Sequence, residues 1–355
     1  MSTHLYRVGI VGCGRVAWLL DADPLIPNKP VTHLGAYERV RWTQVVAGAD
    51  VRPDRRDAFS HMVGKEHVYL DYRKMLAREH LDIVSICAYA SDRYRMVMDA
   101  VDAGVKGIWC EKAFATSLEE AREMTEACSG KGISLIVGHT RRWSPEYRLA
   151  REIIEEGRIG RPLSATCLIS GSLVHTGTHA FDMLRFLLGE ADWVEGHLES
   201  GHHRVSGLLP QRSEEAALRD VGGYAHILFQ NGAYAVVHGE EKEYFLFEFD
   251  IIGTKGRIRI GNWLFEVYEA RQSDRESGLR ELYRIKNRRK KKTHPLVEAV
   301  RHLVACMEGK TEKIGGPREG TAALEMALAI RESHLRGGAR VHMPLGECGL
   351  KVLSR

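Results

Sequence analysis

The sequence predicts a Rossmann domain of the α/β class, with a mostly parallel, doubly wound sheet, followed by an α+β domain with a large open, mostly antiparallel sheet. Three observations predict this fold class. Short apolar runs alternate with helical patterns up to residue 138, a glycine-rich turn follows the first apolar run, and hairpin signals follow one another after residue 163. Strands separated by helices pair in parallel, whereas strands joined by hairpins pair in antiparallel fashion.

The first 138 residues contain the strand and helix patterns of the Rossmann domain. Continuous apolar runs are typical of parallel strands that are buried on both faces. Such runs lie at residues 6–11, 43–49, 82–88, 107–110 and 134–137. Amphipathic stretches lie between the strands and are expected to form crossover helices, at residues 72–79, 94–103 and 117–129.

Beyond residue 138 the pattern changes to that of an α+β domain. Residues 224–229 and 233–238 flank Asn231 and Gly232, an Asn-Gly pair that accepts the positive φ of a tight hairpin turn. A second hairpin is expected from residues 245–252 and 257–261. Helices are expected at residues 146–156, 294–308 and 320–336. Successive strands with helices on one side predict an antiparallel sheet covered on one face.

The length and composition are those of a globular protein with two domains. The chain has 355 residues, too many for one ordinary core. We place a dinucleotide-binding domain at residues 1–138 and a domain for substrate binding and oligomerisation at residues 139–355. No apolar run reaches the about 18 residues of a membrane helix, and the N-terminus has no secretory pattern. Seven scattered cysteines without a C-x-x-C pair predict reduced thiols, a cytoplasmic location and no zinc knuckle.

The charge favours small ligands over nucleic acid. A net charge of +4 is small for this length and suits a mild attraction to anionic ligands. The basic run at residues 288–292 has no interleaved aromatic residue, which is typical of a solvated turn. We therefore expect no nucleic-acid partner and no membrane partner.

The turn after the first strand carries the pattern G-x-G-x-x-A, as G-C-G-R-V-A at residues 12–17. Gly12 permits the tight turn, Gly14 lets the backbone approach a pyrophosphate, and the final alanine lets a helix pack closely on the strand. Backbone amides at the helix start, at Arg15 and Val16, are expected to face the phosphates. The strand-turn-helix context favours a dinucleotide site over a merely tight turn.

Asp50 ends the second strand and is expected to bind the cofactor's ribose. An acid there accepts hydrogen bonds from both ribose hydroxyls of NAD and repels a 2′-phosphate. Arg52 and Arg55 follow closely and offer the alternative, a site for the 2′-phosphate of NADP. We favour NAD. The distance from Gly12 exceeds the about 20 residues usual for this motif, which fits an insertion at residues 21–30 beside the phosphates, in the position of a flap.

Two further motifs narrow the interpretation. One is C-E-K-A at residues 110–113, at the end of a strand, and the other is H-T-G-T-H-A-F-D at residues 175–182. With the glycine turn, they resemble the Gfo/Idh/MocA family, which includes glucose–fructose oxidoreductase and inositol dehydrogenase. The resemblance covers nearly the whole chain, because residues 157–162 resemble the family's transition into the second domain and residues 320–345 its closing helix and strand.

The resemblance implies roles for particular residues. The family's E-K-P motif carries a catalytic lysine, which corresponds to Lys112, and its D-x-G-x-H motif carries a histidine, which corresponds to His179. His175 stands where the family has an aspartate.

Three more departures from the family pattern surround the reactive end of the cofactor. Ala113 replaces a proline, Ala88 and Tyr89 replace the usual nicotinamide contact, and Arg93 replaces a common histidine.

Elementary chemistry supports these roles. Oxidation of an alcohol needs a base that takes the hydroxyl proton, and histidine titrates near neutrality. His179 begins a helical stretch, where the helix dipole favours the neutral ring, and Asp182 lies on the same helical face. Lys112 is expected to stabilise a developing alkoxide, with a pKa that falls if the ammonium is buried beside His175 or His179. His175 either relays a proton or binds a substrate hydroxyl.

The remaining candidates have two interpretations each. Glu111 is expected to act as a structural anchor or to contact the cofactor ribose. Arg142 is expected to touch substrate or cofactor, and Trp143 either walls the substrate pocket or packs in the core. His175 and His179 also have the spacing of two metal ligands on a helix, but no third ligand lies nearby, and we expect no metal.

The resemblance implies an NAD(P)-dependent dehydrogenase or reductase that acts on a sugar, cyclitol or related polyhydroxy compound. One alternative is a redox-neutral enzyme that cleaves or epimerises a sugar through a transient keto form. Another is a non-enzymatic nucleotide-sensing regulator, which retention of Lys112 and His179 disfavours. An open sheet face would be apolar if exposed, so we expect a homodimer or homotetramer that pairs through the hairpins at residues 224–238 and 245–261.

Overall fold

A computed structural model of the chain describes residues 4–174, 176–199, 222–240, 243–286, 293–312, 314–346 and 348–352. The chain forms two compact units. The first contains the residues up to Ser144 together with Thr293–Thr321, and the second contains Pro145–Lys292 together with Ala322–Leu353. These units differ in two respects from the expected division between residues 138 and 139. Residues 139–144 belong to the first unit, and so does the late segment Thr293–Thr321.

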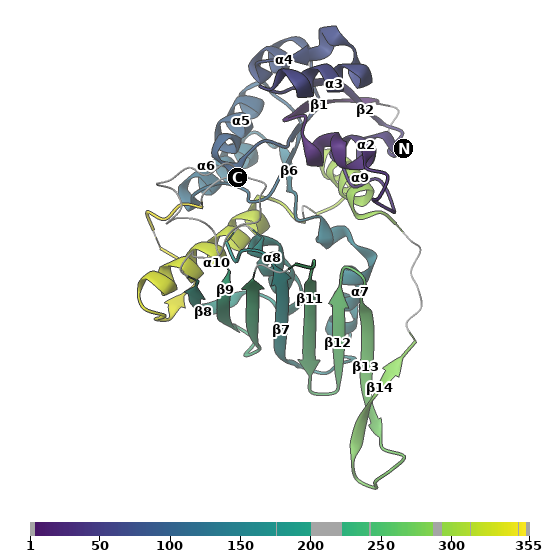
Figure 1. Cartoon of the computed structure of the whole chain (residues 1–355), viewed down its shortest axis with the longest axis vertical. Coiled ribbons are helices and arrows are strands. Elements are labelled where there is room, and N and C mark those ends of the chain that lie inside the picture. Colours follow the sequence, from purple (N-terminus) through teal and green to yellow (C-terminus); the bar gives the residue numbers. More distant parts are fainter. Residues whose placement is uncertain are drawn as a thin grey trace. The chain divides into compact units, whose positions relative to one another are not determined.

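The first unit is built on a six-stranded sheet with the order β3-β2-β1-β4-β5-β6, in which every neighbouring pair is parallel. This is the doubly wound Rossmann order, which confirms the predicted fold class (Figure 1). The strands are β1 (Tyr6–Val11), β2 (Thr43–Ala49), β3 (Val68–Tyr69), β4 (Ile83–Ile86), β5 (Gly107–Cys110) and β6 (Ser134–Val137).

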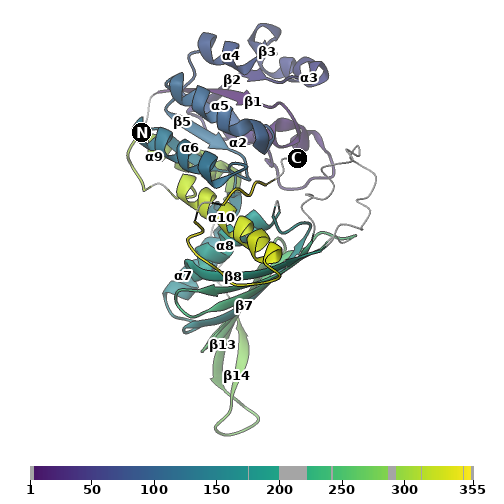
Figure 2. The ribbon, with the colours of Figure 1, turned by 90° about the vertical axis from the view of Figure 1, so that its left-hand side faces the viewer.

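Helices cover the sheet of the first unit. The first crossover is broken into a π-helical turn, η1 (Arg15–Leu19), a short α1 (Leu20–Ala22) and α2 (His33–Glu38). The other helices of this unit are α3 (Pro53–Val63), α4 (Tyr72–Arg78), α5 (Ala90–Asp102), α6 (Leu118–Gly130) and α9 (Pro295–Met307), with short 3-10 turns η2 (Lys65–His67) and η3 (Thr140–Trp143). Figure 2 shows α5 and α6 side by side, and they pack on each other as α2 and α9 do.

The late helix α9 completes a core of the first unit. Its buried residues Val300 and Leu303 join one apolar cluster with Tyr37 of α2 and with Trp109 and Ile136 of the sheet. Burial of such side chains is worth about 1.5–3 kcal/mol each. This packing is the reason that a segment far along the chain belongs to the first unit.

The second unit is built on a nine-stranded sheet with the order β14-β13-β12-β11-β7-β10-β9-β8-β15, in which only β7 and β10 pair in parallel among the described strands. The mostly antiparallel sheet is confirmed. Its strands are β7 (Pro162–Ser170), β8 (Ala191–Leu198), β9 (Gly223–Phe229), β10 (Tyr234–Glu240), β11 (Phe247–Gly253), β12 (Gly256–Gly261), β13 (Phe265–Gln272), β14 (Arg280–Ile285) and β15 (Val341–His342).

The two hairpins predicted in this sheet form. At the first, Gly232 has φ of 82° and the N–H of Phe229 donates to the carbonyl of Ala233 at 2.8 Å. The second joins β11 to β12. Two further hairpins, β12–β13 and β13–β14, were not predicted. Strand β14 is an edge strand whose side chains are exposed or half-buried, and the β13–β14 hairpin projects below the other strands of this sheet in Figure 1.

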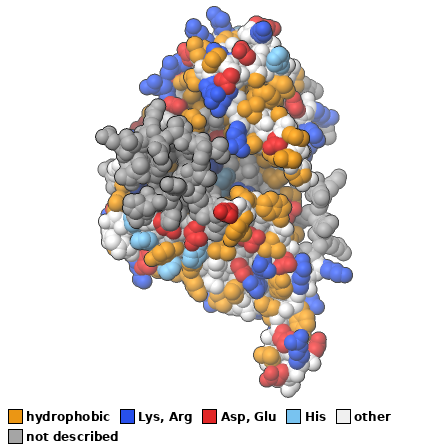
Figure 3. Space-filling model, in the orientation of Figure 1, with side chains coloured by type: hydrophobic (Ala, Val, Ile, Leu, Met, Phe, Trp, Pro, Cys, Tyr) orange, Lys and Arg blue, Asp and Glu red, His pale blue; other side chains and the backbone are white. Residues whose placement is uncertain are grey.

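One face of the second sheet packs against helices α7 (Pro145–Glu155) and α8 (Gly177–Leu188). The same face meets α10 (Pro317–Leu335), where the N–H of Gly196 on β8 donates to the hydroxyl of Ser333; α10 begins in the first unit and lies mostly in the second. The opposite face is mixed in character. The exposed side chains of Tyr224, Tyr234 and Ile252 share it with charged pairs such as Arg259 with Glu266, 3.2 Å apart. Side chains of every class are also interspersed over the part of the second unit visible in Figure 3. Strand alternation places polar residues on this face because one face alone meets helices.

Candidate active site

The glycine turn has the geometry of a phosphate-binding loop. Gly12 has φ of 87°, and a Cβ there would lie 2.9 Å from the carbonyl carbon of Cys87, so only glycine fits. A Cβ at Gly14 would lie 3.0 Å from Arg55. Ala17 is fully buried, as the pattern predicts. The glycine turn is followed by the π-helical turn η1, which contains Arg15 and Val16, and not by the regular helix that we expected.

Asp50 joins the end of β2 to this turn. Its Oδ2 accepts a hydrogen bond from the N–H of Cys13 at 2.8 Å, and its Oδ1 accepts one from the N–H of Arg52 at 2.9 Å. Arg55 lies 3.7 Å from Oδ2, and only 4% of the Asp50 side chain is exposed. A carboxylate held this firmly places a fixed negative charge beside the turn, and each oxygen keeps a lone pair for a ribose hydroxyl.

The loops after β4 and β5 are joined by a residue for which we predicted no role. Arg93 on α5 is 5% exposed; its Nε donates to the carbonyl of Ala88 at 3.0 Å and its Nη1 donates to the carbonyl of Ala113. Ala88 therefore lies in a clamped loop, and Tyr89, which caps α5, is 58% exposed. The replacement of the family's histidine by Arg93 was the only signal of this clamp.

Glu111 and Lys112 directly follow β5. Glu111 Oε1 lies 3.0 Å from Nε2 of the buried His33, and its carboxylate packs over Gly138, where a Cβ would come within 2.5 Å. Burial raises the pKa of Glu111, but the hydrogen bond from His33 and the positive charges of Arg93 and Lys112 outweigh it, so that the pKa lies below its ordinary value. Glu111 is thus an ionised anchor beside the half-buried Lys112, and the Lys112–Ala113 peptide bond is cis.

The segment after β6 contributes buried cations and aromatic rings. Arg142 is 6% exposed, and Trp143 is fully buried in the core of the first unit, with its ring 5.9 Å from that of His302. This position favours the packing interpretation of Trp143 over a pocket wall. Burial and the charges of Arg142 and Lys112 lower the pKa of His139 to about 3, so this ring is neutral at physiological pH.

His179 lies in the first turn of α8 in the second unit. Its ring meets the buried ring of Phe247 edge to face, with centroids 6.4 Å apart, and Asp182 is fully buried on the same helix. His175 lies outside the described residues. Because Lys112 and His179 belong to different units, their convergence over a nicotinamide stays a prediction. Among the residues that the structure describes, no three His, Cys, Asp or Glu side chains are arranged to hold a metal.

Comparison with known proteins decides the family. The sequence model described as "Oxidoreductase family, NAD-binding Rossmann fold" matches residues 6–139, and the model described as "Oxidoreductase family, C-terminal alpha/beta domain" matches residues 151–343. The chain belongs to the Gfo/Idh/MocA family. It is an NAD-binding oxidoreductase, and the cradle formed by Gly12, Gly14 and Asp50 fits that cofactor.

Individual relatives of this Gfo/Idh/MocA oxidoreductase have related names. A myo-inositol 2-dehydrogenase of Thermotoga maritima is 23% identical over 92% of this chain and 96% of its own length. A D-apiose dehydrogenase of Paraburkholderia graminis is 33% identical over 44% of this chain and 46% of its own length. The solved structure of levoglucosan dehydrogenase with NADH and levoglucosan has a TM-score of 0.75 at 22% identity, and the match covers 96% of this chain and 100% of that one.

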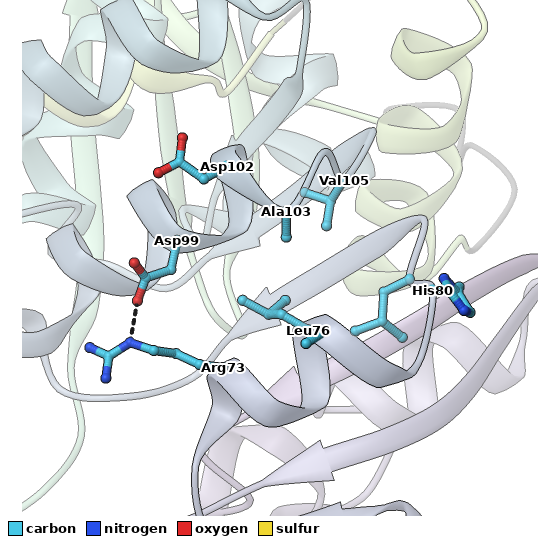
Figure 4. Close-up of a pocket in the computed structure, with 9 residues that line it drawn as sticks. Arg73, Leu76, His80, Asp99, Asp102, Ala103 and Val105 are labelled. Atoms are coloured by element: carbon cyan, nitrogen blue, oxygen red, sulfur yellow. Dashed lines mark hydrogen bonds and ion pairs between the residues drawn. The ribbon is translucent and has the colours of Figure 1, made fainter.

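A cavity within the first unit of this oxidoreductase lies away from these residues. It has a volume of about 460 Å³ and is lined by residues at the ends of α4 and α5, at the amino edge of the first sheet. Figure 4 shows Arg73 and Asp99 joined across its rim, with Leu76 and Val105 lining it. Ligands of open α/β sheets bind outside the carboxyl ends of the strands, so this cavity is not the cofactor site. No helix in the described part of the chain is long and apolar enough to cross a bilayer.

Proposed function

We propose that this oxidoreductase transfers a hydride between NAD and a hydroxyl-bearing carbon of a sugar, cyclitol or related polyhydroxy compound. The observation that carries the proposal is the anchored Glu111–Lys112 pair at the carboxyl edge of an NAD-binding sheet. The names of the relatives, which include myo-inositol and D-apiose dehydrogenases, support the substrate class.

In this mechanism Lys112 binds the substrate oxygen. Its ammonium donates a hydrogen bond to the reacting hydroxyl and stabilises the negative charge that develops as the proton leaves. Two contacts hold the segment that presents Lys112. The carboxylate of Glu111 is hydrogen-bonded to His33, and the guanidinium of Arg93 donates a hydrogen bond to the carbonyl of Ala113. The bound nicotinamide accepts or supplies the hydride.

His179 takes the hydroxyl proton in the oxidation direction and returns it in the reduction direction. A neutral imidazole is suited to this exchange near pH 7. The edge-to-face contact with Phe247 restrains one side of the ring. His175 is proposed to bind a neighbouring hydroxyl or to relay the proton.

We propose NAD rather than NADP as the working cofactor. A 2′-phosphate beside Asp50 would meet a buried carboxylate that already accepts hydrogen bonds from the N–H groups of Cys13 and Arg52. Arg55 lies near the same carboxylate and partly balances its charge. Repulsion of the additional phosphate charge favours NAD.

The proposal is tested by identifying the nucleotide that copurifies and then screening sugars and polyols for NADH formation by absorbance. Lys112→Ala should lower kcat by about 10²- to 10⁴-fold, while the Kd for NAD stays within about threefold. Lys106→Ala is the control, because Lys106 is 61% exposed, pairs with Asp82 and lies before β5. Full activity in Lys112→Ala would overturn the assignment. Conversion of substrate without net NADH would support the redox-neutral alternative instead.

We also propose that the protein assembles as a homodimer or homotetramer through the open face of the second sheet. The support is two exposed tyrosines on that face, Tyr224 and Tyr234, which are 47% and 54% exposed. Aromatic residues are enriched at interfaces. Light scattering at micromolar concentration should give a multiple of the chain mass, and Tyr234→Glu should lower it; a monomeric mass for the unaltered protein contradicts the assembly. Seven free cysteines support a cytoplasmic location, which cell fractionation tests.

A further inference from the structure

A buried chain of hydrogen bonds runs from helix α2 to the segment that carries Lys112. Tyr37 Oη lies 2.9 Å from Ser85 Oγ, Ser85 Oγ lies 3.0 Å from His33 Nδ1, and His33 Nε2 lies 3.0 Å from Glu111 Oε1. Tyr37, Ser85 and His33 are at most 1% exposed. Three elements distant in the sequence, α2, β4 and the end of β5, therefore meet in one polar chain inside an apolar core.

The end of this hydrogen-bond chain at Glu111 has a definite direction. An ionised carboxylate only accepts, so Nε2 of His33 donates to Glu111. Nδ1 of His33, the Ser85 hydroxyl and the Tyr37 hydroxyl complete the chain through two further hydrogen bonds. Burial raises the pKa of Tyr37, so the phenol keeps its proton, and the pKa of Glu111 is lowered, so its carboxylate is ionised. A fully satisfied buried network fixes its members in one geometry.

Packing fixes the imidazole as firmly as the hydrogen bonds do. The His33 ring is stacked on Trp109 of β5, with centroids 3.7 Å apart and an interplanar angle of 25°. Trp109 is fully buried and lies on β5, two residues before Glu111, which follows the strand. The ring therefore contacts β5 along its face and the residue after β5 through its edge.

The insertion at residues 21–30 determines where α2 begins. Asp21 Oδ1 accepts from the N–H of Val31 at 2.7 Å, and Asp21 Oδ2 accepts from the hydroxyl of Thr32. Thr32 is the N-cap of α2 and accepts from the N–H of Gly35 at 3.2 Å. One carboxylate thus ties the start of the insertion to the residue that precedes His33.

We propose that His33 is a positioning residue, which holds Glu111 and thereby the backbone that presents Lys112. In this proposal, which rests on the proposed function, the insertion is a buttress that sets His33 through Asp21 and Thr32, and not the flap that its sequence position suggests. The glycine turn and the lysine segment are then linked through α2. A misplacement of about 1 Å at a reacting group costs about 100-fold in rate, so the effect falls on kcat.

The main test is His33→Phe, which keeps a ring to stack on Trp109 and removes both hydrogen bonds. We expect kcat to fall about 30-fold, less than the about 100-fold that a misplacement of about 1 Å costs, with the Kd for NAD and the KM for substrate within about threefold. His33→Gln, whose amide donates and accepts, should recover most of this loss. Asp21→Ala and Tyr37→Phe should each give smaller losses of kcat.

The matched control is His67→Phe. His67 also pairs with a glutamate, with its Nδ1 2.8 Å from Glu79 Oε1, but its side chain is 40% exposed and it lies outside the proposed machinery. This variant should keep kcat. A folded, NAD-binding His33→Phe variant with unchanged kcat would overturn the proposal, as would a loss of rate that follows NAD affinity alone.

Hydrogen exchange gives a readout that needs no substrate. In His33→Phe the amides of residues 111–115 should exchange at least about tenfold faster, because the segment has lost its anchor, whereas His67→Phe should leave them unchanged. Faster exchange in a protein that oxidises no polyol would leave the positioning role in place and remove the proposed function. Unchanged exchange in residues 111–115 would remove the positioning role. If His33→Phe does not fold, Tyr37→Phe and Asp21→Ala answer the same question by the same two measurements, with smaller expected effects.

Discussion

The two edges of the first sheet carry the same kinds of charged pairs in opposite surroundings. At the carboxyl edge, Asp50, Arg93 and Glu111 are buried or nearly so and bond to backbone groups or to a buried side chain. At the amino edge, Arg73 pairs with Asp99 at 2.9 Å, with side chains 51% and 30% exposed. Hydrogen bonds of a buried charge are worth about 1.5–3 kcal/mol each, whereas an exposed pair is worth about 0–1 kcal/mol.

This difference teaches that the presence of a cavity does not identify the functional edge of this sheet. The cavity of about 460 Å³ lies at the amino edge, beside the exposed pair. The residues that the sequence marks as functional lie at the other edge, where ionised groups are held away from water. Substitutions at the two edges should therefore have unequal effects.

Arg93→Met should show the largest effect. The change removes two buried hydrogen bonds, to the carbonyls of Ala88 and Ala113, and should lower the free energy of unfolding by about 2–4 kcal/mol. Release of the lysine segment should also lower kcat about 100-fold. Denaturant unfolding and steady-state kinetics measure both. Arg93→Lys should recover part of each loss, and wild-type stability in Arg93→Met would show that the carboxyl edge is no different from the amino edge.

His139 should give the carboxyl edge a distinct response to acid. Its pKa is about 3 in the folded protein, against 6.5 as its ordinary value. Between these values the unfolded chain binds the additional proton, so stability is complete above pH 6.5 and declines as the pH falls, by up to about 1.4 kcal/mol per unit. His139→Gln should flatten the dependence of the unfolding free energy on pH between about 6.5 and 4. An equally steep dependence in that variant would contradict the buried neutral ring.

Asp50→Ala should reduce NAD affinity about tenfold, since a lost pair of charge-assisted hydrogen bonds to the ribose amounts to about 1.4 kcal/mol or more. The ratio of the Kd for NADP to the Kd for NAD should decrease at the same time, because the Asp50 carboxylate that repels the 2′-phosphate has been removed. Titration of both nucleotides by calorimetry measures the two effects together. Equal loss of affinity for NAD and NADP would indicate that Asp50 acts only by tying the glycine turn to β2.

Arg73→Ala at the amino edge should show the smallest effect. Its partner Asp99 remains accessible to water, so the unfolding free energy should change by less than about 1 kcal/mol. The kcat should stay within about twofold, as measured in the assay used for Arg93→Met. A large loss of activity would assign a function to the cavity that Figure 4 shows.

Local signals predicted the elements well and long-range contacts poorly. Apolar runs located five strands of the first sheet, and Asn231 with Gly232 located a hairpin, because each signal lies within a few residues. The short β3 and the polar β13–β14 hairpin lack such signals. The link between His33 and Glu111 joins residues 78 positions apart, and nothing in either neighbourhood specifies the other. For the same reason the sequence left two interpretations of Trp143 open.

The return of α9 to the first unit has a consequence for how the protein is made. On the ribosome, residues 4–144 emerge long before Val300 and Leu303, so the nascent chain carries an uncovered apolar surface around Trp109 and Ile136 until α9 arrives. A fragment truncated at Ser144 would keep that surface bare and adhere to itself or to chaperones. An isolated nucleotide-binding half suited to dissection should therefore have α9 spliced back on through a short linker.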